Sequence, residues 1–495
     1  MKYILAIDQG TTSTRAIAFN NEGKISSLDQ KEHKQYYPKS GYVEHNAEEI
    51  WNNVVEVCNN TVSKIGGWEV IEAIGITNQR ETIVSWKKDT QSVLAPAIVW
   101  QCRRTTNIVE KLIQEDYKEL FKEKTGLVLD AYFSGTKIQW MINNIPEVKK
   151  ELERENVQFG TIETFLINKM SGKHVTDVSN ASRTLLFNLK YKKWDQELLD
   201  ILKIKESSLP EVIPSVLYEP IAGYWKRENR DIPILGLAGD QQAALFGQTA
   251  FEFGNSKITY GTGNFALTNT GSNIRKSDNG LLTTVAWADG DLNKTTYALE
   301  GSVFITGALV QWLRDELEFF KEAKEIENLA KLADDIGNLV IVPAFVGLGA
   351  PYWDQRAGGL IIGLTRGSNK SHIAKAALES IAFQTYDLLK LMEEESGKKV
   401  SLRVDGGASQ NDYLMQLQSN IIQEEITRPI NIETTALGAA FMAGLGSGYW
   451  ESISALKQLN PPETIFSPDK NYPRDKKLKY WETAVKRSLQ WNLED

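Results

Sequence analysis

The first residues whose types and spacing could do chemistry stand near the N-terminus, in a polar turn between two apolar runs. The run "YILAID" ends in Asp8, and Gly10, Thr11, Thr12 and Ser13 follow it. Such a turn exposes successive backbone N–H groups and hydroxyls, which can hold phosphate oxygens. A carboxylate beside phosphate is repelled unless a divalent cation lies between them, and Mg²⁺ binds carboxylate, water and phosphate oxygens together. Asp8 therefore predicts a Mg²⁺ site, although ordinary hairpin chemistry explains this motif alone equally well.

Two further glycine turns favour phosphate binding. "ITYGTGNFALTN", which contains Thr262, repeats the order of apolar strand, Gly-Thr turn and apolar strand. Duplicated domains that face each other would place these two turns on opposite walls of one cleft. "RVDGGASQND" at 403–412 adds a glycine turn where a nucleotide could approach the backbone, although strand-glycine-helix connections are common. The motifs of P-loop, Rossmann and protein kinase nucleotide sites do not occur in the sequence.

A second group of residues fits an acceptor that bears hydroxyl groups. Asp240 stands where "IPILGLAG" changes to "DQQAALFG"; it could cap a helix or accept a hydroxyl proton during phosphoryl transfer. Arg80 and Glu81, in the turn "NQRE", could donate to and accept from a polyol, or form a local surface ion pair. Trp100 and Tyr132 lie among polar residues, so their rings could cover C–H groups of the same ligand; core packing is the alternative for each.

The composition limits the class of protein. A chain of 495 residues exceeds what one hydrophobic core usually serves, so we expect two domains, residues 1–250 and 251–495. The net charge of −8 argues against a nucleic-acid or anionic-membrane surface and favours a small-molecule substrate. Cys58, Cys102 and four scattered histidines form neither a disulfide framework nor a zinc site. With no signal peptide or membrane-spanning pattern, we expect a cytoplasmic protein.

The elements that must position these residues alternate between strands and helices. Residues 3–20 predict a hairpin, and 46–65 predict a helix with Asn46 as its N-cap. Residues 70–77 and 82–87 predict strands on either side of "NQRE". A strand at 232–239 should lead into a helix at 240–247. The expected fold class is therefore mixed α/β.

Together the motifs resemble those of the FGGY carbohydrate kinases, in family order from residue 3 to about 450. The segments that carry the resemblance are "YILAIDQGTTSTRA", "GITNQRET", "APAIVWQCRRT", "YFSGTKIQWMINN", "GLAGDQQAALFGQ", "YGTGNF", "GLGAPYWDQRAGGLIIGLTRG" and "LRVDGGASQND". Among them "NQRET", "VWQCRRT" and "GDQQAAL" are most similar to the members that phosphorylate glycerol. The resemblance implies a two-domain fold of the actin, heat-shock chaperone and hexokinase type, with the active site in the interdomain cleft.

The resemblance also implies a role for each matched residue. It implies that Asp8 organises Mg²⁺ and that Asp240 is the general base in the transfer of phosphate from ATP to glycerol, the first step of glycerol utilisation. The nucleotide-binding residues that it implies are Thr11, Thr12, Ser13, Arg15, Thr262, Gly307, Gln311, Gly407 and Asn411. The glycerol-binding residues that it implies are Arg80, Glu81, Trp100, Tyr132, Asp240, Gln241 and Phe265. It further implies a homo-oligomer, either a dimer or a tetramer.

One segment departs from parts of the family. Before the strand at 232–239, some members carry a Gly-Gly-Thr-Arg loop for fructose 1,6-bisphosphate, and others carry a histidine that a phosphocarrier phosphorylates. Residues 223–233 are "GYWKRENRDIP", so we expect neither regulation. Three alternative functions stay open: an FGGY kinase for a pentulose or sugar acid, an ATP-driven switch of the actin or chaperone type, and a phosphatase on the same fold.

Overall fold

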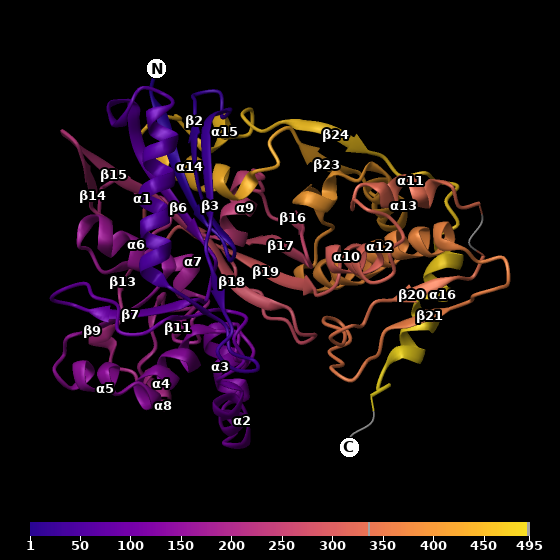
Figure 1. The fold of residues 1–495 in the computed structure, drawn as a ribbon, viewed down its shortest axis with the longest axis horizontal. Helices are drawn as coiled ribbons and strands as arrows, with labels where there is room; N and C mark the ends of the chain where they lie inside the picture. The colour runs from indigo at the N-terminus through magenta and orange to yellow at the C-terminus, as the bar shows by residue number, and fades with distance from the viewer. Residues whose placement is uncertain (335–336, 493–495) are drawn as a thin grey trace.

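Two large sheets form the centres of two bodies that lie side by side in the computed structural model (Figure 1). The structure describes residues 1–334 and 337–492. The first sheet has six strands in the order β14-β15-β6-β1-β2-β3. Their bounds are β1 (Tyr3–Gln9), β2 (Ser13–Phe19), β3 (Ile25–Glu32), β6 (Ile71–Asn78), β14 (Tyr224–Arg227) and β15 (Arg230–Gly239).

The second sheet has seven strands in the order β18-β19-β17-β16-β22-β23-β24. Their bounds are β16 (Asn255–Tyr260), β17 (Asn264–Gly271), β18 (Leu282–Ala288), β19 (Thr295–Val303), β22 (Ser401–Asp405), β23 (Ile426–Pro429) and β24 (Pro462–Phe466). β1 pairs antiparallel with β2 and parallel with β6, and β16 likewise pairs antiparallel with β17 and parallel with β22. The predicted repeat of strand, Gly-Thr turn and strand is therefore confirmed, because each hairpin opens a sheet of the same order.

The remaining strands form one five-stranded sheet and three two-stranded sheets. The five-stranded sheet contains β4 (Gln35–Tyr36), β5 (Glu44–His45), β8 (Ala97–Ile98), β7 (Ile83–Lys87) and β9 (Val157–Thr161). The pairs are β10 (Val175–Asp177) with β13 (Glu211–Ile213), β11 (Phe187–Asn188) with β12 (Lys193–Trp194), and β20 (Val340–Val342) with β21 (Leu360–Ile362). The predicted strands around "NQRE" are β6 and β7, which the turn joins across two different sheets.

The helices cover the sheets and connect them. Those before residue 250 are α1 (Ala47–Ser63), α2 (Thr106–Gln114), α3 (Lys118–Thr125), α4 (Ser134–Asn144), α5 (Pro146–Glu153), α6 (Ile162–Ser171), α7 (Val178–Ala181), α8 (Gln196–Leu202) and α9 (Asp240–Gly247). Those after it are α10 (Gly307–Asp315), α11 (Glu325–Lys331), α12 (Lys370–Ser396), α13 (Asp412–Ile422), α14 (Thr434–Gly446), α15 (Ile453–Leu456) and α16 (Arg474–Ser488). Short 3₁₀ helices are η1 (Trp68–Val70), η2 (Glu206–Ser208) and η3 (Gly407–Gln410).

Helix α1 begins where the sequence predicts. The Asn46 side chain caps it by accepting from the backbone N–H groups of Glu48 and Glu49. Ile50, Val54 and other apolar residues at helical spacing are buried against the first sheet. The cap provides a hydrogen-bond acceptor for backbone N–H groups at the start of the helix, and packing removes its apolar side chains from water. Both effects stabilise the helix.

Helix α14 comes late in the chain but packs on the first sheet, against β1, β6 and β15 (Figure 1). It also crosses α9 at very short range: a Cβ atom added to Gly438 would lie 1.8 Å from the carbonyl oxygen of Ala243. A Cβ atom on Gly247 would lie 2.0 Å from the carbonyl oxygen of Thr434. Only glycine permits this approach. The crossing therefore fixes α9, which begins with Asp240, between the two sheets.

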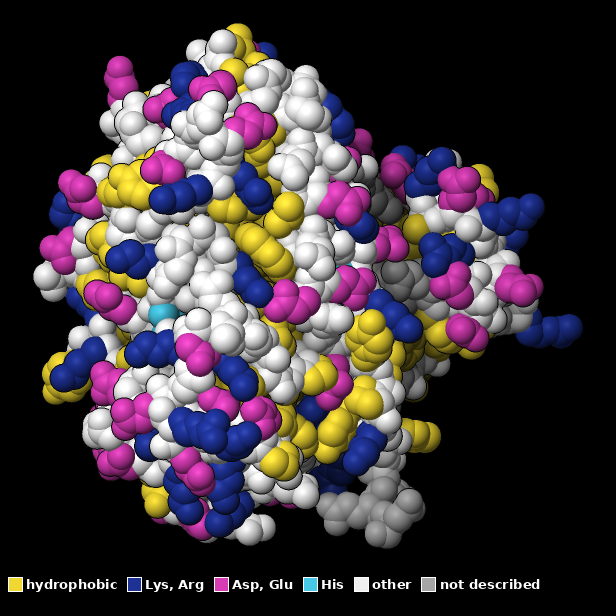
Figure 2. Space-filling view, turned by 60° about the vertical axis from the view of Figure 1, so that its left-hand side comes forward, with side chains coloured by type: hydrophobic (Ala, Val, Ile, Leu, Met, Phe, Trp, Pro, Cys, Tyr) yellow, Lys and Arg dark blue, Asp and Glu magenta, His cyan; other side chains and the backbone are white. Residues whose placement is uncertain are grey.

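The surface carries charged side chains of both signs. In the face shown in Figure 2, Lys and Arg side chains are interspersed with Asp and Glu, without a basic stripe. Across the described ranges, every helix is too short or too polar to cross a membrane.

Candidate active site

The turn at residues 10–13, called the phosphate-type turn below, lies between β1 and β2 and is closed by a backbone hydrogen bond. The N–H of Gly10 donates to the carbonyl of Ser13 over 2.9 Å, which leaves Thr12 exposed at the tip. Asp8 is buried at the end of β1 and pairs in register with Arg15 on β2. The Arg15 guanidinium contacts the Asp8 carboxylate and also Glu433, at 2.5 Å. Arg15 thus joins the turn to the residue that precedes α14.

The donor set at Asp8 is compatible with Mg²⁺. This cation takes one or two carboxylates and completes its shell with waters and substrate phosphates. Among the described residues no group of three or more His, Cys, Asp or Glu could hold a metal by itself. A single carboxylate beside a turn of N–H and hydroxyl groups suits a cation that arrives with a polyphosphate.

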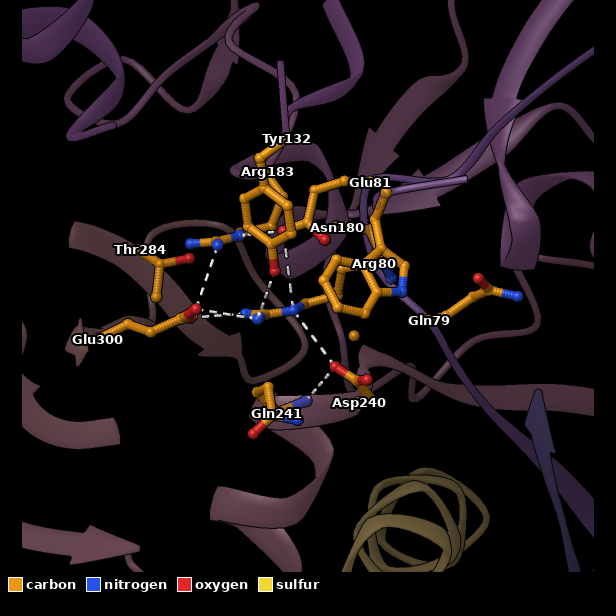
Figure 3. A network of polar contacts seen from close by, with 12 residues as sticks. Gln79, Arg80, Glu81, Tyr132, Asn180, Arg183, Asp240, Gln241, Thr284 and Glu300 are labelled. Atoms are coloured by element: carbon orange, nitrogen blue, oxygen red, sulfur yellow. Dashed lines mark hydrogen bonds and ion pairs between the residues drawn. The ribbon is translucent and has the colours of Figure 1, made fainter. Parts of the chain in front are cut away.

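The predicted acceptor residues Arg80 and Asp240 contact each other (Figure 3). Arg80 Nε lies 3.2 Å from Oδ1 of Asp240, and the side chains are 2% and 33% exposed. The surface ion pair considered for Arg80 and Glu81 is therefore wrong, because both residues are buried. The N-cap of α9 is Gly239, with Asp240 as the first helical residue, so capping does not explain Asp240.

The environment of Asp240 suits a proton acceptor. Burial raises the pKa of this carboxyl to about 6, the Arg80 charge opposes the shift, and the Glu81 charge adds to it. A base whose pKa lies just below neutral pH is ionised at pH 7 and still accepts a proton readily. The carboxylate is the exposed end of an otherwise buried polar network, so a hydroxyl group could reach it.

Two aromatic side chains, Trp100 and Tyr132, form a wall next to Arg80, whose Nη2 lies 3.5 Å from the Tyr132 hydroxyl. The Trp100 and Tyr132 rings meet edge to face, with centroids 5.6 Å apart. The indole Nε1 of Trp100 donates to the hydroxyl of Thr11 over 2.9 Å. Glu81, behind the wall, has φ of 61°, a left-handed conformation that is uncommon for this residue type and concentrates at functional sites. The wall therefore touches the phosphate-type turn directly.

The second sheet also contributes side chains that contact the acceptor residues. In an antiparallel sheet, residues directly opposite each other point to the same face. Phe265 is paired with Ser302, and Leu267 with Glu300 and Lys257, so the side chains of Phe265, Glu300 and Lys257 share one face. Glu300 contacts Arg80, and Lys257 contacts the Gln241 side chain. This face of the second sheet therefore borders the acceptor residues, with the half-buried Phe265 on it.

The predicted nucleotide residues of the second body line one open cavity of about 1030 Å³, counting the space at its mouth. Thr262, Gly307, Gln311, Gly407 and Asn411 are all among its lining residues. Val310, Ile326, Leu378 and Leu414 add apolar surface. A cavity lined by both glycine turns and aliphatic side chains suits a nucleotide, whose base is apolar and whose phosphates need N–H donors.

The glycines of this cavity hold backbone segments together. The N–H of Gly307 donates to the carbonyl of Gly261 over 3.0 Å, and a Cβ atom on Gly307 would lie 2.6 Å from that oxygen. At Gly407 a Cβ atom would meet nothing within 4 Å. Gly307 is therefore required by packing, whereas Gly407 leaves open space at the start of η3.

Several charged residues of the site were not predicted from the sequence. Arg183, Lys257 and Glu300 are buried and contact predicted acceptor residues, while Glu433 contacts Arg15. The only local signal is a charged residue inside an apolar strand, as in "TYALEGSV" around Glu300. Buried charges need partners, but the sequence does not say which ones.

Comparison with known proteins agrees with this geometry. Residues 3–247 match the N-terminal domain and residues 256–447 the C-terminal domain of the FGGY family of carbohydrate kinases. The chain is 52% identical to a glycerol kinase of Thermococcus onnurineus, over 99% of this chain and 98% of that protein. It superposes on Plasmodium falciparum glycerol kinase with ADP with a TM-score of 0.93, at 36% identity over 99% and 98% of the two chains. A ligand-bound xylulose kinase from Lactobacillus acidophilus follows with a TM-score of 0.84, at 26% identity over 99% and 97%.

Proposed function

Because the chain belongs to the FGGY family of carbohydrate kinases, we propose that it transfers the γ-phosphoryl group of ATP to glycerol and releases ADP and sn-glycerol 3-phosphate. One observation carries this proposal: Trp100, on the wall of the acceptor pocket, donates to Thr11 of the phosphate-type turn over 2.9 Å. An acceptor against Trp100 would therefore sit beside the phosphates that the turn holds. Reacting groups must be this close for direct transfer.

In the proposed reaction, Asp240 accepts the proton of one terminal hydroxyl of glycerol. The hydroxyl oxygen forms a bond to the γ-phosphorus as the bond to the ADP oxygen breaks, and Asp240 holds the proton that is released. Arg80, Glu81 and Gln241 bind and orient the other hydroxyls. Trp100, Tyr132 and Phe265 pack on the carbon chain and exclude water, which otherwise competes as acceptor.

The nucleotide binds across the cleft. Thr11, Thr12, Ser13 and Arg15 hold phosphates from the first body, and the residues lining the cavity of the second body hold the remainder of the nucleotide. Asp8 would hold Mg²⁺, and this cation would neutralise phosphate charge when bound. Arg15 exchanges its contact with Asp8 for a phosphate oxygen as the nucleotide enters.

We further propose that the protein acts in the cytoplasm as a homo-oligomer. ATP is the phosphoryl donor. The two cysteines, Cys58 and Cys102, are buried free thiols, which are typical of proteins in a reducing compartment. The mass of the purified protein in solution, measured by light scattering, tests the oligomer.

The test of the reaction is ADP release from Mg²⁺-ATP with glycerol, xylulose, gluconate or no acceptor. We expect strong stimulation by glycerol alone, because relatives that the chain matches over almost its whole length are glycerol kinases. A preference for xylulose or gluconate would keep the family but overturn the substrate. Equal slow release in every sample would instead indicate an ATP-driven switch.

A further inference from the structure

Four buried side chains around the acceptor pocket form a closed ring of alternating charge (Figure 3). Arg80 contacts Glu300 at 2.6 Å, Glu300 contacts Arg183 at 3.1 Å, and Arg183 contacts Glu81 at 2.6 Å. Glu81 closes the ring at 3.8 Å from Arg80 Nε. All four side chains are 3% exposed or less. Two members are acceptor residues, and the other two lie behind them.

Glu300 determines which edge of the Arg80 guanidinium remains for a ligand. Its two oxygens accept from Nη1 at 2.6 Å and Nη2 at 2.9 Å, the bidentate geometry that fixes a guanidinium plane. Nη1 also donates to Gln242 over 3.3 Å, and Nε faces Asp240. Nη2 also has a long contact of 3.5 Å with the Tyr132 hydroxyl. A ligand hydroxyl between Nη2 and Tyr132 would replace that weak contact with two short ones.

Arg183 performs the equivalent task for Glu81. Its Nε donates to Glu81 Oε1 over 2.6 Å, and its guanidinium lies near the rings of Tyr132 and Phe133. This hydrogen bond holds the Glu81 carboxylate while the backbone of that residue is in a left-handed conformation. Burial opposes ionisation of Glu300, but the charges of Arg183 and Arg80 outweigh it and lower the pKa of Glu300 to about 2. Glu300 is therefore ionised throughout the neutral range.

The ring also joins the two bodies of the protein. Arg80, Glu81 and Arg183 come from the first body, whereas Glu300 lies on β19 of the second sheet. Glu300 and Arg80 are 220 positions apart in the chain. The orientation of the acceptor pocket thus depends on a carboxylate from the sheet that contributes the nucleotide cavity.

We propose that Glu300 and Arg183 are positioning residues of the acceptor site, which hold Arg80 and Glu81 in the orientation that binds the hydroxyls of glycerol. This inference rests on the proposed function. Neither residue touches the ligand itself, so their loss should weaken recognition of the polyol without weakening that of ATP.

The test compares Glu300→Gln with the wild-type enzyme in steady-state assays that vary glycerol and ATP separately. Gln keeps the shape of the side chain but loses the charge and one acceptor oxygen, so Arg80 loses its bidentate partner. We expect the KM for glycerol to rise by about tenfold or more, as for loss of a charge-assisted hydrogen bond, with the KM for ATP within about twofold.

The matched control is Glu163→Gln, the same change at another buried carboxylate. Glu163 accepts from the hydroxyls of Thr161, Thr164 and Thr176 and has no contact with the ring among the bonds of the described residues. The Glu163→Gln variant should leave the KM for glycerol unchanged. Arg183→Lys is the second variant, for use if Glu300→Gln does not fold. A lysine keeps the charge but lacks the planar guanidinium, which contacts Glu81 through Nε and Glu300 through Nη2. We therefore expect the same rise in the KM for glycerol.

Two results would overturn the inference: a KM for glycerol within about twofold of wild type in both folded variants, or parallel rises in the KM for glycerol and for ATP, which would indicate general disruption. The wild-type assay separates this failure from that of the proposed function. If the wild-type protein shows no glycerol-dependent turnover, both fail; if it does and the variants match it, only the positioning role fails.

Discussion

The Nε atom of Arg80 lies 3.2 Å from Oδ1 of Asp240, on the side of the guanidinium opposite to its bidentate contact with Glu300. The candidate base Asp240 therefore lies beside the cation of Arg80, and Glu300 compensates the charge of that cation on its other side. Asp240 is also the most exposed of these three groups, at 33% of its side chain. This arrangement leads to the first two predictions.

Replacing Asp240 with Asn should remove the proton acceptor and keep the shape of the side chain. We expect kcat to fall by about a hundredfold or more, the usual scale for loss of a general base, while glycerol binding measured by calorimetry persists. Asp231→Asn, on the exposed part of β15, is the control and should be neutral. Turnover of Asp240→Asn near that of Asp231→Asn would remove Asp240 from the role of base.

The pH dependence of kcat should follow the same carboxyl. Burial raises its pKa to about 6, and the base works only when it is ionised. Activity should therefore be full above pH 7 and fall by about tenfold per pH unit well below pH 6. The wild-type profile at saturating substrates measures this limb, and a profile flat down to pH 5 would contradict it.

Replacing Asp8 with Ala should weaken use of Mg²⁺-ATP. The variant loses the single carboxylate beside the Gly10–Ser13 turn, so a higher Mg²⁺ concentration should be needed for half-maximal rate, with lower kcat. Glycerol binding without nucleotide should be unchanged, since Asp8 is placed in the phosphate site. An unaltered Mg²⁺ dependence would show that the metal is held elsewhere.

Replacing Gly307 with Ala should raise the KM for ATP. The new Cβ atom would lie 2.6 Å from the carbonyl oxygen of Gly261, so the Gly-Thr-Gly turn must shift. We expect a rise of about tenfold or more, with the KM for glycerol nearly constant. Gly367→Ala is the control, because its Cβ would meet only a hydroxyl at 3.8 Å. Equal ATP kinetics in the two variants would argue against nucleotide binding at this turn.

Local sequence signals predicted the elements that carry the site. The apolar runs and the Gly10 turn predicted the β1–β2 hairpin, and the change from apolar strand to helix predicted the position of Asp240. These signals succeed because hydrophobic periodicity and turn chemistry act between residues that are close in the chain. The same signals predicted strands on both sides of "NQRE", but not that these strands enter different sheets.

The sequence by itself determined the family motifs, the two Gly-Thr turns and the residue types of the acceptor site. Only the tertiary structure decided that Glu300 reaches Arg80 across 220 positions, that Arg183 holds Glu81 across 102, and that α14 packs on the first sheet. The physical reason is that a buried charge demands a partner but does not specify it. Sheet register and the glycine contacts between α9 and α14 bring the two halves together, and these depend on the whole chain.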